Sequence, residues 1–358
     1  MKNRKLTIEE SFGQMIMLGL DCYDINEEIE KIIKKYKIGG VVLYKKNYTS
    51  IDTMIEFINK LKRINKENNN IPLFIAIDQE NGRVNRFPNE IERIISAKKI
   101  ASLKETEMNY IHKLTTYLLN SVGVNMNFAP VLDVVRDSKN KAIGNRSYGN
   151  DSSVILKCAL DFMKEMQKNN IISVVKHFPG HGLTNRDSHV FLPKIKDIDT
   201  MKQVDIKVFY DAIKSGADAI MVGHLTIKGY GIMPASINKK IVSDLLINNG
   251  YKGLIITDDL RMKPLRLLCK EKKCVKKAIN VGNDILMIKY KKGDLKRLYD
   301  PLMKQLKKFE IDIEKVSKSA KKVISYKNKY KITDELIDNK LDIVKINKNI
   351  RKLNEKFK

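Results

Sequence analysis

The chain has 358 residues, of which 43% are hydrophobic and 31% charged, and its formal net charge is +26. This composition supplies a large core and excludes wholesale disorder, while no apolar run approaches the roughly 18 residues of a membrane span. The apolar run at residues 15–20 is shorter than a signal-peptide core of about 7–15 residues, and four scattered cysteines make no disulfide framework, so we expect a cytoplasmic protein.

Short apolar runs alternate with longer amphipathic segments along the whole chain. The apolar runs cover residues 15–20, 39–44, 73–77, 123–128, 172–176, 217–223, 253–257 and 284–288. The amphipathic segments include residues 25–36, 51–64, 105–120, 152–169 and 201–215. Such runs are typical of strands buried on both faces in a parallel sheet, and eight strand–helix alternations favour a (β/α)8 barrel over a doubly wound sheet. The predicted fold is α/β, a single (β/α)8 TIM-type barrel over residues 1–330, with residues 331–358 as a C-terminal helical extension on its outside.

Charged or ionisable side chains follow five of the eight apolar runs. They are Asp78, Asp133, the pair Lys176 and His177, His224, and the pair Asp258 and Asp259. Active sites of barrels of this type lie at the carboxyl ends of the strands. The pattern therefore predicts a pocket at that end.

The segment VKHFPGHGLTNRDSHVFLP, residues 175–193, holds three of the five histidines, His177, His181 and His189. Asp187 stands two residues before His189, a spacing that lets a carboxylate hold an imidazole nitrogen and make the ring more basic. A solvated loop histidine and a zinc site are the alternatives, but neither HExxH nor CxxC spacing is present.

Asp258 and Asp259 follow the seventh apolar run, in LIITDDL. A carboxylate at the end of a buried strand can attack an electrophilic carbon, whereas an Asp at a helix start can also be an ordinary N-cap. The segment DQENGRVNR adds Asp78, Arg83 and Arg86, a set suited to gripping hydroxyls and carbonyls; its alternative interpretation is a solvated loop.

Together these segments resemble the bacterial β-N-acetylhexosaminidases of glycoside hydrolase family 3. The resemblance covers residues 11 to about 290 and runs in order through SFGQMIMLG, GGVVLYKKN, IDQENGRVNRF, GVNMNFAPVLDV, IGNRSYG, VVKHFPGHGLTNRDSHVFLP, AIMVGHL, MPAS and LIITDDLRM. It implies an exo-acting enzyme that uses a retaining mechanism through a covalent glycosyl-enzyme. The close relatives are cytoplasmic single-barrel enzymes of cell-wall recycling, which remove N-acetylglucosamine from anhydromuramyl peptides.

The resemblance also implies roles for individual residues. Asp258 matches the nucleophile, His189 the general acid/base, and Asp187 its dyad partner. The residues that match binders of the N-acetylglucosamine ring are Asp78, Arg86, Arg146, Lys176 and His177. Most retaining glycosidases use two carboxylates, but an imidazole with a pKa near 6.5 can protonate a leaving oxygen and then deprotonate water. No cofactor and no metal are expected.

The sequence departs from the family pattern at a few positions. Asn81 stands where a Gly is usual, Thr257 replaces a Ser, Arg261 follows the DDL string, and Lys289 with Tyr290 replaces a small polar pair. The segment RMKPLRLLCKEKKCVKKAINVGND is more cationic than its counterparts, which predicts stronger attraction for anionic material. None of these changes removes a catalytic match.

The excess of positive charge has two interpretations, a polyanionic partner or compositional drift toward Lys, Asn and Ile. Drift is favoured, because Lys rather than Arg carries the charge and because it is spread along the chain. We expect a monomer with a small carbohydrate substrate and neither a specific nucleic acid nor a membrane as partner. The alternatives are a phosphorylase of the same family, with phosphate as acceptor, and a non-catalytic descendant that binds amino sugars or polyanions.

Overall fold

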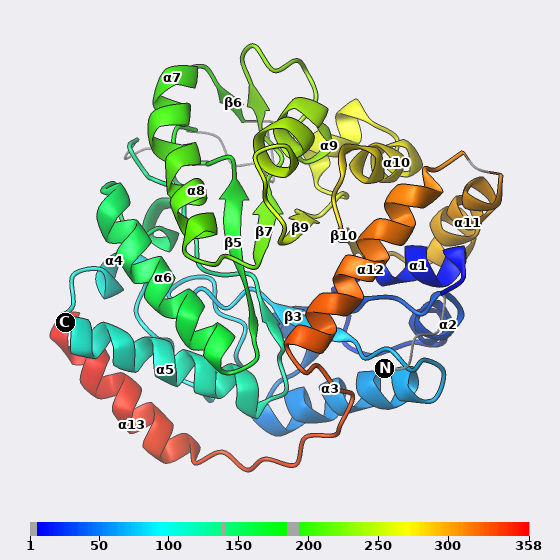
Figure 1. Cartoon of the computed structure of the whole chain (residues 1–358). Helices are drawn as coiled ribbons and strands as arrows, with labels where there is room; N and C mark the ends of the chain where they lie inside the picture. Colours follow the sequence, from blue (N-terminus) through cyan, green and yellow to red (C-terminus); the bar gives the residue numbers. More distant parts are fainter. Residues whose placement is uncertain (1–5, 138–139, 185–192, 309, 358) are drawn as a thin grey trace.

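A computed structural model describes residues 6–137, 140–184, 193–308 and 310–357 of the chain. Eight parallel strands form one sheet in the order β10-β1-β2-β3-β4-β5-β7-β9 (Figure 1). Their bounds are β1 Ile16–Leu20, β2 Gly40–Leu43, β3 Phe74–Ile77, β4 Met126–Asn127, β5 Ile172–Phe178, β7 Ala219–Val222, β9 Leu254–Thr257 and β10 Leu286–Lys289. A parallel bridge between Ile256 and Ile285 joins the two edges and closes the barrel. The predicted (β/α)8 barrel is confirmed.

Each of the eight predicted apolar runs overlaps one barrel strand, but the fourth strand is much shorter than expected. The side chain of Asn125 accepts a hydrogen bond from the Ile75 backbone N–H at 2.8 Å and donates one to the Leu73 carbonyl at 3.1 Å. The Asn125 side chain thus bonds backbone groups at the start of β3 that a longer β4 would have paired, and β4 begins only at Met126. The sequence also missed a two-residue ladder between β6 (Lys194–Ile195) and β8 (Thr226–Ile227).

Helices surround the barrel. The α-helices are α1 Ile8–Gln14, α2 Glu27–Tyr36, α3 Ile51–Lys66, α4 Ala97–Ile100, α5 Glu105–Ser121, α6 Ser152–Lys168, α7 Ile198–Thr200, α8 Lys207–Lys214, α9 Lys263–Leu268, α10 Glu271–Val281, α11 Asp300–Lys307, α12 Ile313–Lys329 and α13 Ile343–Asn354. Shorter or wider turns are η1 Lys45–Asn47, η2 Gly144–Arg146, η3 Met201–Ile206, η4 Ala235–Ile237, η5 Lys240–Ile247, η6 Leu295–Tyr299 and η7 Glu355–Phe357. None of the described helices has the length and apolar character needed to cross a bilayer.

The helix starts follow from local chemistry. The side chains of Asn26, Ser50 and Asp151 accept hydrogen bonds from backbone N–H groups in the first turns of α2, α3 and α6. Such caps satisfy donors that would otherwise lack a partner. The predicted helix over 201–215 is in fact divided into the π-helical η3 and α8, and α7 directly precedes them.

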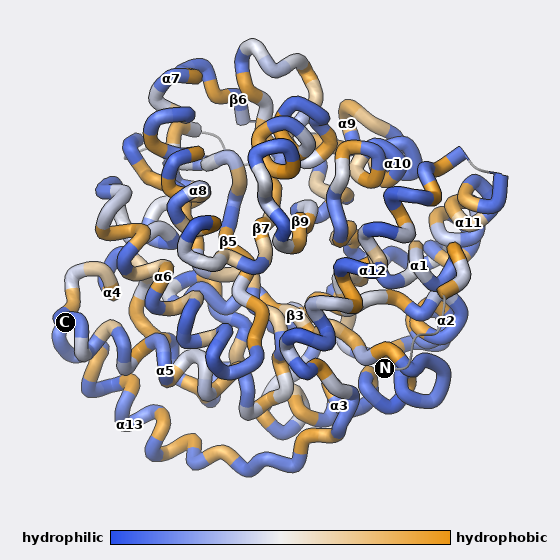
Figure 2. Tube along the Cα trace, in the orientation of Figure 1, coloured by the Kyte–Doolittle hydropathy of each residue, from blue (hydrophilic) through white to orange (hydrophobic). Residues whose placement is uncertain are grey.

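Alternate residues of the strands point into the barrel and fill it. Phe74 and Ala76 of β3 belong to the inner cluster, while Ile75 and Ile77 pack outward against the helices. The same alternation gives apolar runs that are buried on both faces. In Figure 2 the central strands are accordingly mostly orange, whereas orange and blue alternate along the outer helices.

A buried lysine of α12 contacts the amino ends of the strands. Lys327 donates hydrogen bonds to Gln14 Oε1 at 2.8 Å and to the Gly39 carbonyl at 2.7 Å, and its ammonium lies 4.8 Å from the centre of the Phe74 ring. Complete burial lowers the pKa of Lys327 to about 7. The charged form of this lysine therefore costs folding energy at neutral pH.

We expect Lys327→Met to remove a rise of stability with pH. The pKa of the lysine is about 7 in the folded chain and about 10.4 when unfolded. Between these values the unfolded chain binds more protons, so the unfolding free energy of the unmodified protein increases with pH, by at most about 4 kcal/mol. Methionine binds no proton, so urea unfolding of both proteins between about pH 7 and pH 10 should give diverging curves. Parallel curves would contradict the assignment.

The C-terminal extension packs on the outside of the barrel as predicted, but only its second half is the helix α13 (Figure 1). Before α13 the chain runs along α3 without helical structure. Asn59 exchanges two hydrogen bonds with the backbone of Ile337, at 2.8 and 2.9 Å, and Lys62 donates to the Glu335 carbonyl at 2.8 Å. Because side chains of α3 satisfy this backbone, a helix is not required there. Dividing the chain into domains at residue 330 stays a prediction.

Candidate active site

The barrel brings the five predicted sugar-binding residues to the carboxyl ends of its strands. Asp78 directly follows β3, Lys176 and His177 lie in β5, Arg86 lies in the loop after β3, and Arg146 ends η2. In Figure 1 the arrow of β5 points toward this end of the molecule, where β6, α9 and α10 also lie. The five residues therefore gather at the predicted end of the barrel, and their role in binding a sugar stays a prediction.

Glu80, which the sequence analysis did not select, links this set. Its carboxylate accepts hydrogen bonds from Arg146 Nε at 2.7 Å and Nη2 at 2.8 Å, and its Oε1 lies 2.6 Å from Lys176 Nζ. Lys176 also donates to Asp78 Oδ1 at 2.8 Å, and Arg86 Nη2 lies 3.4 Å from Asp78 Oδ2. The side chains of Glu80 and Lys176 are each only 2% exposed. A continuous ion-pair network therefore joins residues far apart in the sequence.

The cations decide the protonation of these carboxyls. Burial by itself would raise the pKa of Asp78, but Lys176 and Arg86 outweigh it and hold that pKa below its usual value. Burial likewise opposes ionisation of Glu80, and Arg146 with Lys176 brings the pKa of Glu80 well below its usual range. Both groups are carboxylates at neutral pH, ready to accept hydrogen bonds.

Glu80→Gln is expected to lower the unfolding free energy by about 3 kcal/mol, because removing one member of a buried ion pair leaves the other charge uncompensated. Lys176 would then keep its ion pair with Asp78, and Arg146 would keep only the weaker influence of the Asp133 and Asp78 charges. The measurement is urea unfolding at pH 7. Glu27→Gln, which breaks an exposed pair with Lys31, is the control and should cost less than about 1 kcal/mol. Equal costs for the two variants would contradict this account.

Asp133 orients the imidazole of His177. Its Oδ2 lies 2.7 Å from His177 Nδ1, and its Oδ1 accepts hydrogen bonds from the backbone N–H groups of His177 and His181, at 3.2 and 2.7 Å. A carboxylate at Nδ1 favours the tautomer with the proton there, which leaves Nε2 as an acceptor, 3.4 Å from Arg146 Nη2. Burial would raise the pKa of Asp133, but His177 and His181 hold it below its usual value.

Asp258 and Asp259 directly follow β9, at the same end of the barrel. Asp258 is half-buried, and its Oδ1 accepts a hydrogen bond from the Asp259 backbone N–H at 2.7 Å. Asp259 Oδ1 accepts from the backbone of Arg261 at 3.0 Å and of Lys289 at 3.1 Å, so Asp259 ties the loop after β9 to β10. Burial raises the pKa of Asp259. Asp259 therefore has the local structural role that the sequence allowed for this pair, whereas the role of Asp258 as a nucleophile stays a prediction.

Tyr44 lies near the carboxyl groups of both Asp78 and Asp259. Its ring centre is 6.0 Å from the Arg86 guanidinium carbon and 5.2 Å from Lys289 Nζ. Burial, followed by the charges of Asp259 and Asp78, raises the pKa of its phenol. The side chain of Tyr44 thus contributes an aromatic surface between β9 and β3, a contribution that no sequence pattern had indicated.

The predicted dyad of Asp187 and His189 lies outside the described residues. The described chain just before it is closely packed: His181 Nδ1 lies 2.6 Å from Thr184 Oγ1, and burial lowers the pKa of His181 to about 4. At Gly182 an added Cβ would lie 1.8 Å from the Val134 carbonyl oxygen, so only glycine fits there.

Further residues of this end escaped the sequence analysis. Asp205 is buried beneath Gly180 and is paired with Arg136, and burial raises the pKa of Asp205 to about 6. The sequence signal for Glu80 was its place within DQENGRVNR, whereas Asp133 had been selected because it follows an apolar run. Asp205 lies within an amphipathic segment and gave no signal.

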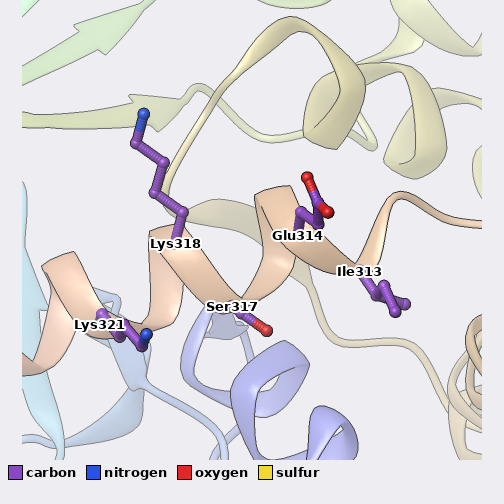
Figure 3. A pocket seen from close by; sticks show the side chains of 5 residues that line it. All are labelled: Ile313, Glu314, Ser317, Lys318 and Lys321. Atoms are coloured by element: carbon purple, nitrogen blue, oxygen red, sulfur yellow. The ribbon is translucent and has the colours of Figure 1, made fainter.

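Two open hollows lie away from these residues, on the outer helices. One, of about 360 Å³, is lined by Ile313, Glu314, Ser317, Lys318 and Lys321 of α12 (Figure 3). The other, of about 450 Å³, is lined by Glu9, Lys35, Tyr36, Asp300, Met303, Lys304 and Lys307. Neither contains a predicted site residue. Within the described ranges, no group of three or more His, Cys, Asp or Glu side chains is placed to hold a metal ion.

Comparison with known proteins supplies independent findings. The family model of the glycosyl hydrolase family 3 N-terminal domain matches residues 7–326. Beta-hexosaminidase A of Pseudoalteromonas piscicida is 29% identical, over 90% of this chain and 61% of that protein, so this chain spans about three fifths of that relative's length. A beta-hexosaminidase of Xylella fastidiosa is 28% identical, over 76% of this chain and 83% of its own. The solved structure of a glycoside hydrolase family 3 beta-N-acetylglucosaminidase from a Paenibacillus superposes with a TM-score of 0.89 at 26% identity, covering 98% of this chain and 69% of that one.

Proposed function

The chain belongs to glycosyl hydrolase family 3, and from this premise we propose that it is a retaining exo-β-N-acetylglucosaminidase, a β-N-acetylhexosaminidase. The observation that carries the proposal is the joining of Asp78, Arg86, Arg146, Lys176 and His177 around two buried carboxylates at the end of the barrel where Asp258 lies. The names of the two curated relatives and of the Paenibacillus structure support the same activity.

The network suits an uncharged, hydroxyl-rich ring with an acetamido group. Asp78 is a carboxylate that accepts hydrogen bonds from hydroxyls, while Arg86 and Lys176 donate to hydroxyl and carbonyl oxygens. Within the described residues Arg86 Nε is buried without a hydrogen-bond partner. A buried donor without a partner costs free energy, so the protein itself does not use all the hydrogen bonds that Arg86 can donate.

In the proposed mechanism Asp258 attacks the anomeric carbon while His189 protonates the departing glycosidic oxygen. A covalent glycosyl-enzyme results. His189, now neutral, then takes a proton from water, which attacks the same carbon and releases the sugar with its original configuration. Asp187 orients the imidazole in both steps. The roles of these three residues come from the resemblance of the sequence to the family.

The proposed substrate is the N-acetylglucosamine end of peptidoglycan-derived anhydromuropeptides, which would place the enzyme in cell-wall recycling. Support for this finer assignment comes from the sequence motifs alone. A phosphorylase would differ only in the second step, where phosphate instead of water would accept the glycosyl group.

Aryl β-N-acetylglucosaminide and aryl β-glucoside, offered side by side, test the proposal. Hydrolysis should be faster on the acetamido sugar and should not depend on phosphate. Preference for the glucoside would overturn the substrate assignment. A requirement for phosphate, with a sugar phosphate as product, would favour the phosphorylase, and no turnover of either sugar would favour the non-catalytic descendant.

A further inference from the structure

The surface formed by α9 and α10 combines positive charge with exposed leucines. Residues 261–277 contain eight basic residues and one acidic residue. They begin three residues after Asp258, so this surface borders the carboxyl end of the barrel (Figure 1). We call the side chains exposed there the α9–α10 surface, namely Lys263, Arg266, Leu267, Leu268, Lys270, Lys272 and Lys273.

Almost none of this charge is neutralised by the protein. Arg261 is buried and holds both available carboxylates, with a bidentate contact to Asp294 at 2.6 and 2.7 Å and an ion pair to Glu271. Within the described residues, none of the five cations of the α9–α10 surface forms an ion pair. Elsewhere on the molecule many exposed lysines do, for example Lys31 with Glu27 and Lys157 with Glu105. The local charge therefore attracts an external anion.

The exposed leucines narrow the choice of partner. Leu267 is 77% exposed and Leu268 43% exposed, while their neighbours Leu265 and Cys269 are buried in the core. In Figure 2 α9 accordingly carries orange segments beside blue ones. A polynucleotide contacts cations through its phosphates and gains little from leucine side chains. An anionic bilayer offers phosphates for the cations and an apolar layer just below for the leucines.

Neighbouring segments extend the same character. Lys291 and Lys292 are exposed in the loop after β10, and burial followed by the charges of Arg261 and Arg266 lowers the pKa of Lys291, which places these cations close together. Ile232, 76% exposed, lies in the loop that leads into η4, and η4 packs against α10. Cations and apolar side chains therefore continue beyond α9 itself.

We propose that the α9–α10 surface docks the protein on anionic phospholipid bilayers, with Leu267 and Leu268 entering the headgroup layer and the surrounding cations contacting lipid phosphates. This replaces the expectation of no membrane contact, which rested on the lack of a spanning segment. Peripheral binding needs only a charged, partly apolar surface. The opening of the barrel end would then lie beside the bilayer.

The natural chain contains no tryptophan, so one introduced indole reports on its own surroundings. Leu267→Trp is expected to shift its emission to shorter wavelength with vesicles of equal parts phosphatidylcholine and phosphatidylglycerol, and brominated lipid tails should quench it. Val344→Trp on α13, at a position 83% exposed, is the matched control and should show neither effect. Leu267→Trp emission that stays unshifted and unquenched on bound vesicles would overturn the proposal.

Charge variants test the same contact by vesicle sedimentation at low salt. Lys270→Gln/Lys272→Gln/Lys273→Gln should weaken binding to the anionic vesicles on the order of a hundredfold, whereas Lys345→Gln/Lys348→Gln/Lys352→Gln on α13 should weaken it severalfold at most. Phosphatidylcholine vesicles should bind neither. Equal losses of binding in the two triple variants would overturn the proposal and leave a general attraction to polyanions. Unchanged vesicle binding by Leu267→Ser/Leu268→Ser would do the same.

Discussion

Asp258→Ala should lower kcat/KM for an aryl β-N-acetylglucosaminide by about 10⁴-fold or more, because no other group can form the glycosyl-enzyme bond. The backbone N–H of Asp258 donates to the Val222 carbonyl at 3.1 Å, a contact that alanine retains. The lost hydrogen bond from the Asp259 backbone N–H should cost about 1 kcal/mol of unfolding free energy. If circular dichroism shows that the variant is folded, the loss of activity reflects the missing carboxylate and not unfolding.

Two readouts identify Asp258 as the nucleophile rather than its neighbour. A 2-fluoro amino-sugar analogue that forms a slow glycosyl-enzyme should leave its mass on the peptide carrying Asp258, and fragmentation should assign it to that residue. Azide added to Asp258→Ala should enter the vacated space and yield the α-glycosyl azide by a single displacement. An adduct on Asp259, or β-glycosyl azide from this variant, would defeat the assignment.

His189→Ala should reduce kcat/KM according to how much the leaving group needs a proton. A nitrophenolate departs without help, so its glycoside should be attacked far more readily than a disaccharide, for which a loss of about 10²–10⁴-fold is expected. Release of the glycosyl-enzyme should then limit turnover, because no base activates water. Azide should restore turnover and give the β-glycosyl azide, since it needs no deprotonation.

Leaving groups of graded acidity test this role against the alternatives. The slope of log kcat/KM against leaving-group pKa should be steeper for His189→Ala than for the unmodified enzyme. Asp187→Asn should give a milder form of the same pattern, because the imidazole remains but loses its orienting charge. A zinc ligand would instead lose activity on all substrates alike and respond to chelators, and a slope no steeper than normal would reject the acid/base role.

The overall fold was available from the sequence. Runs such as 73–77 and 253–257 are continuously or nearly continuously apolar because a barrel strand is buried on both faces, and such a run is a local property of the chain. For the same reason Asp78 and Asp258 were found, since a charged residue after a buried run marks where the strand leaves the core; Lys176 was found in the same way, although β5 continues to Phe178 and keeps it buried. The sequence predicted β4 as too long and missed β6 and β8, because a strand of two residues is too short to produce a recognisable hydrophobic pattern.

The candidate site was only partly available. The motifs selected Asp78, Arg86, Arg146, Lys176 and His177 one by one, but the role of Glu80 and the pairing of Asp133 with His177 emerged only when loops far apart in the chain came together. Lys176 and Asp78 are 98 positions apart, and Arg146 and Glu80 are 66 apart. Such pairings depend on which loops the barrel places side by side.

The α9–α10 surface, too, was determined partly by the sequence and partly by the tertiary structure. The sequence by itself determined how many lysines follow Asp258 and that Leu267 and Leu268 stand among them. Only the tertiary structure decided that Glu271 and Asp294 are consumed by the buried Arg261, which leaves the neighbouring cations unpaired and the two leucines in solvent. Burial and ion pairing are properties of spatial neighbours, and the chain's order of residues specifies those neighbours only through the complete fold.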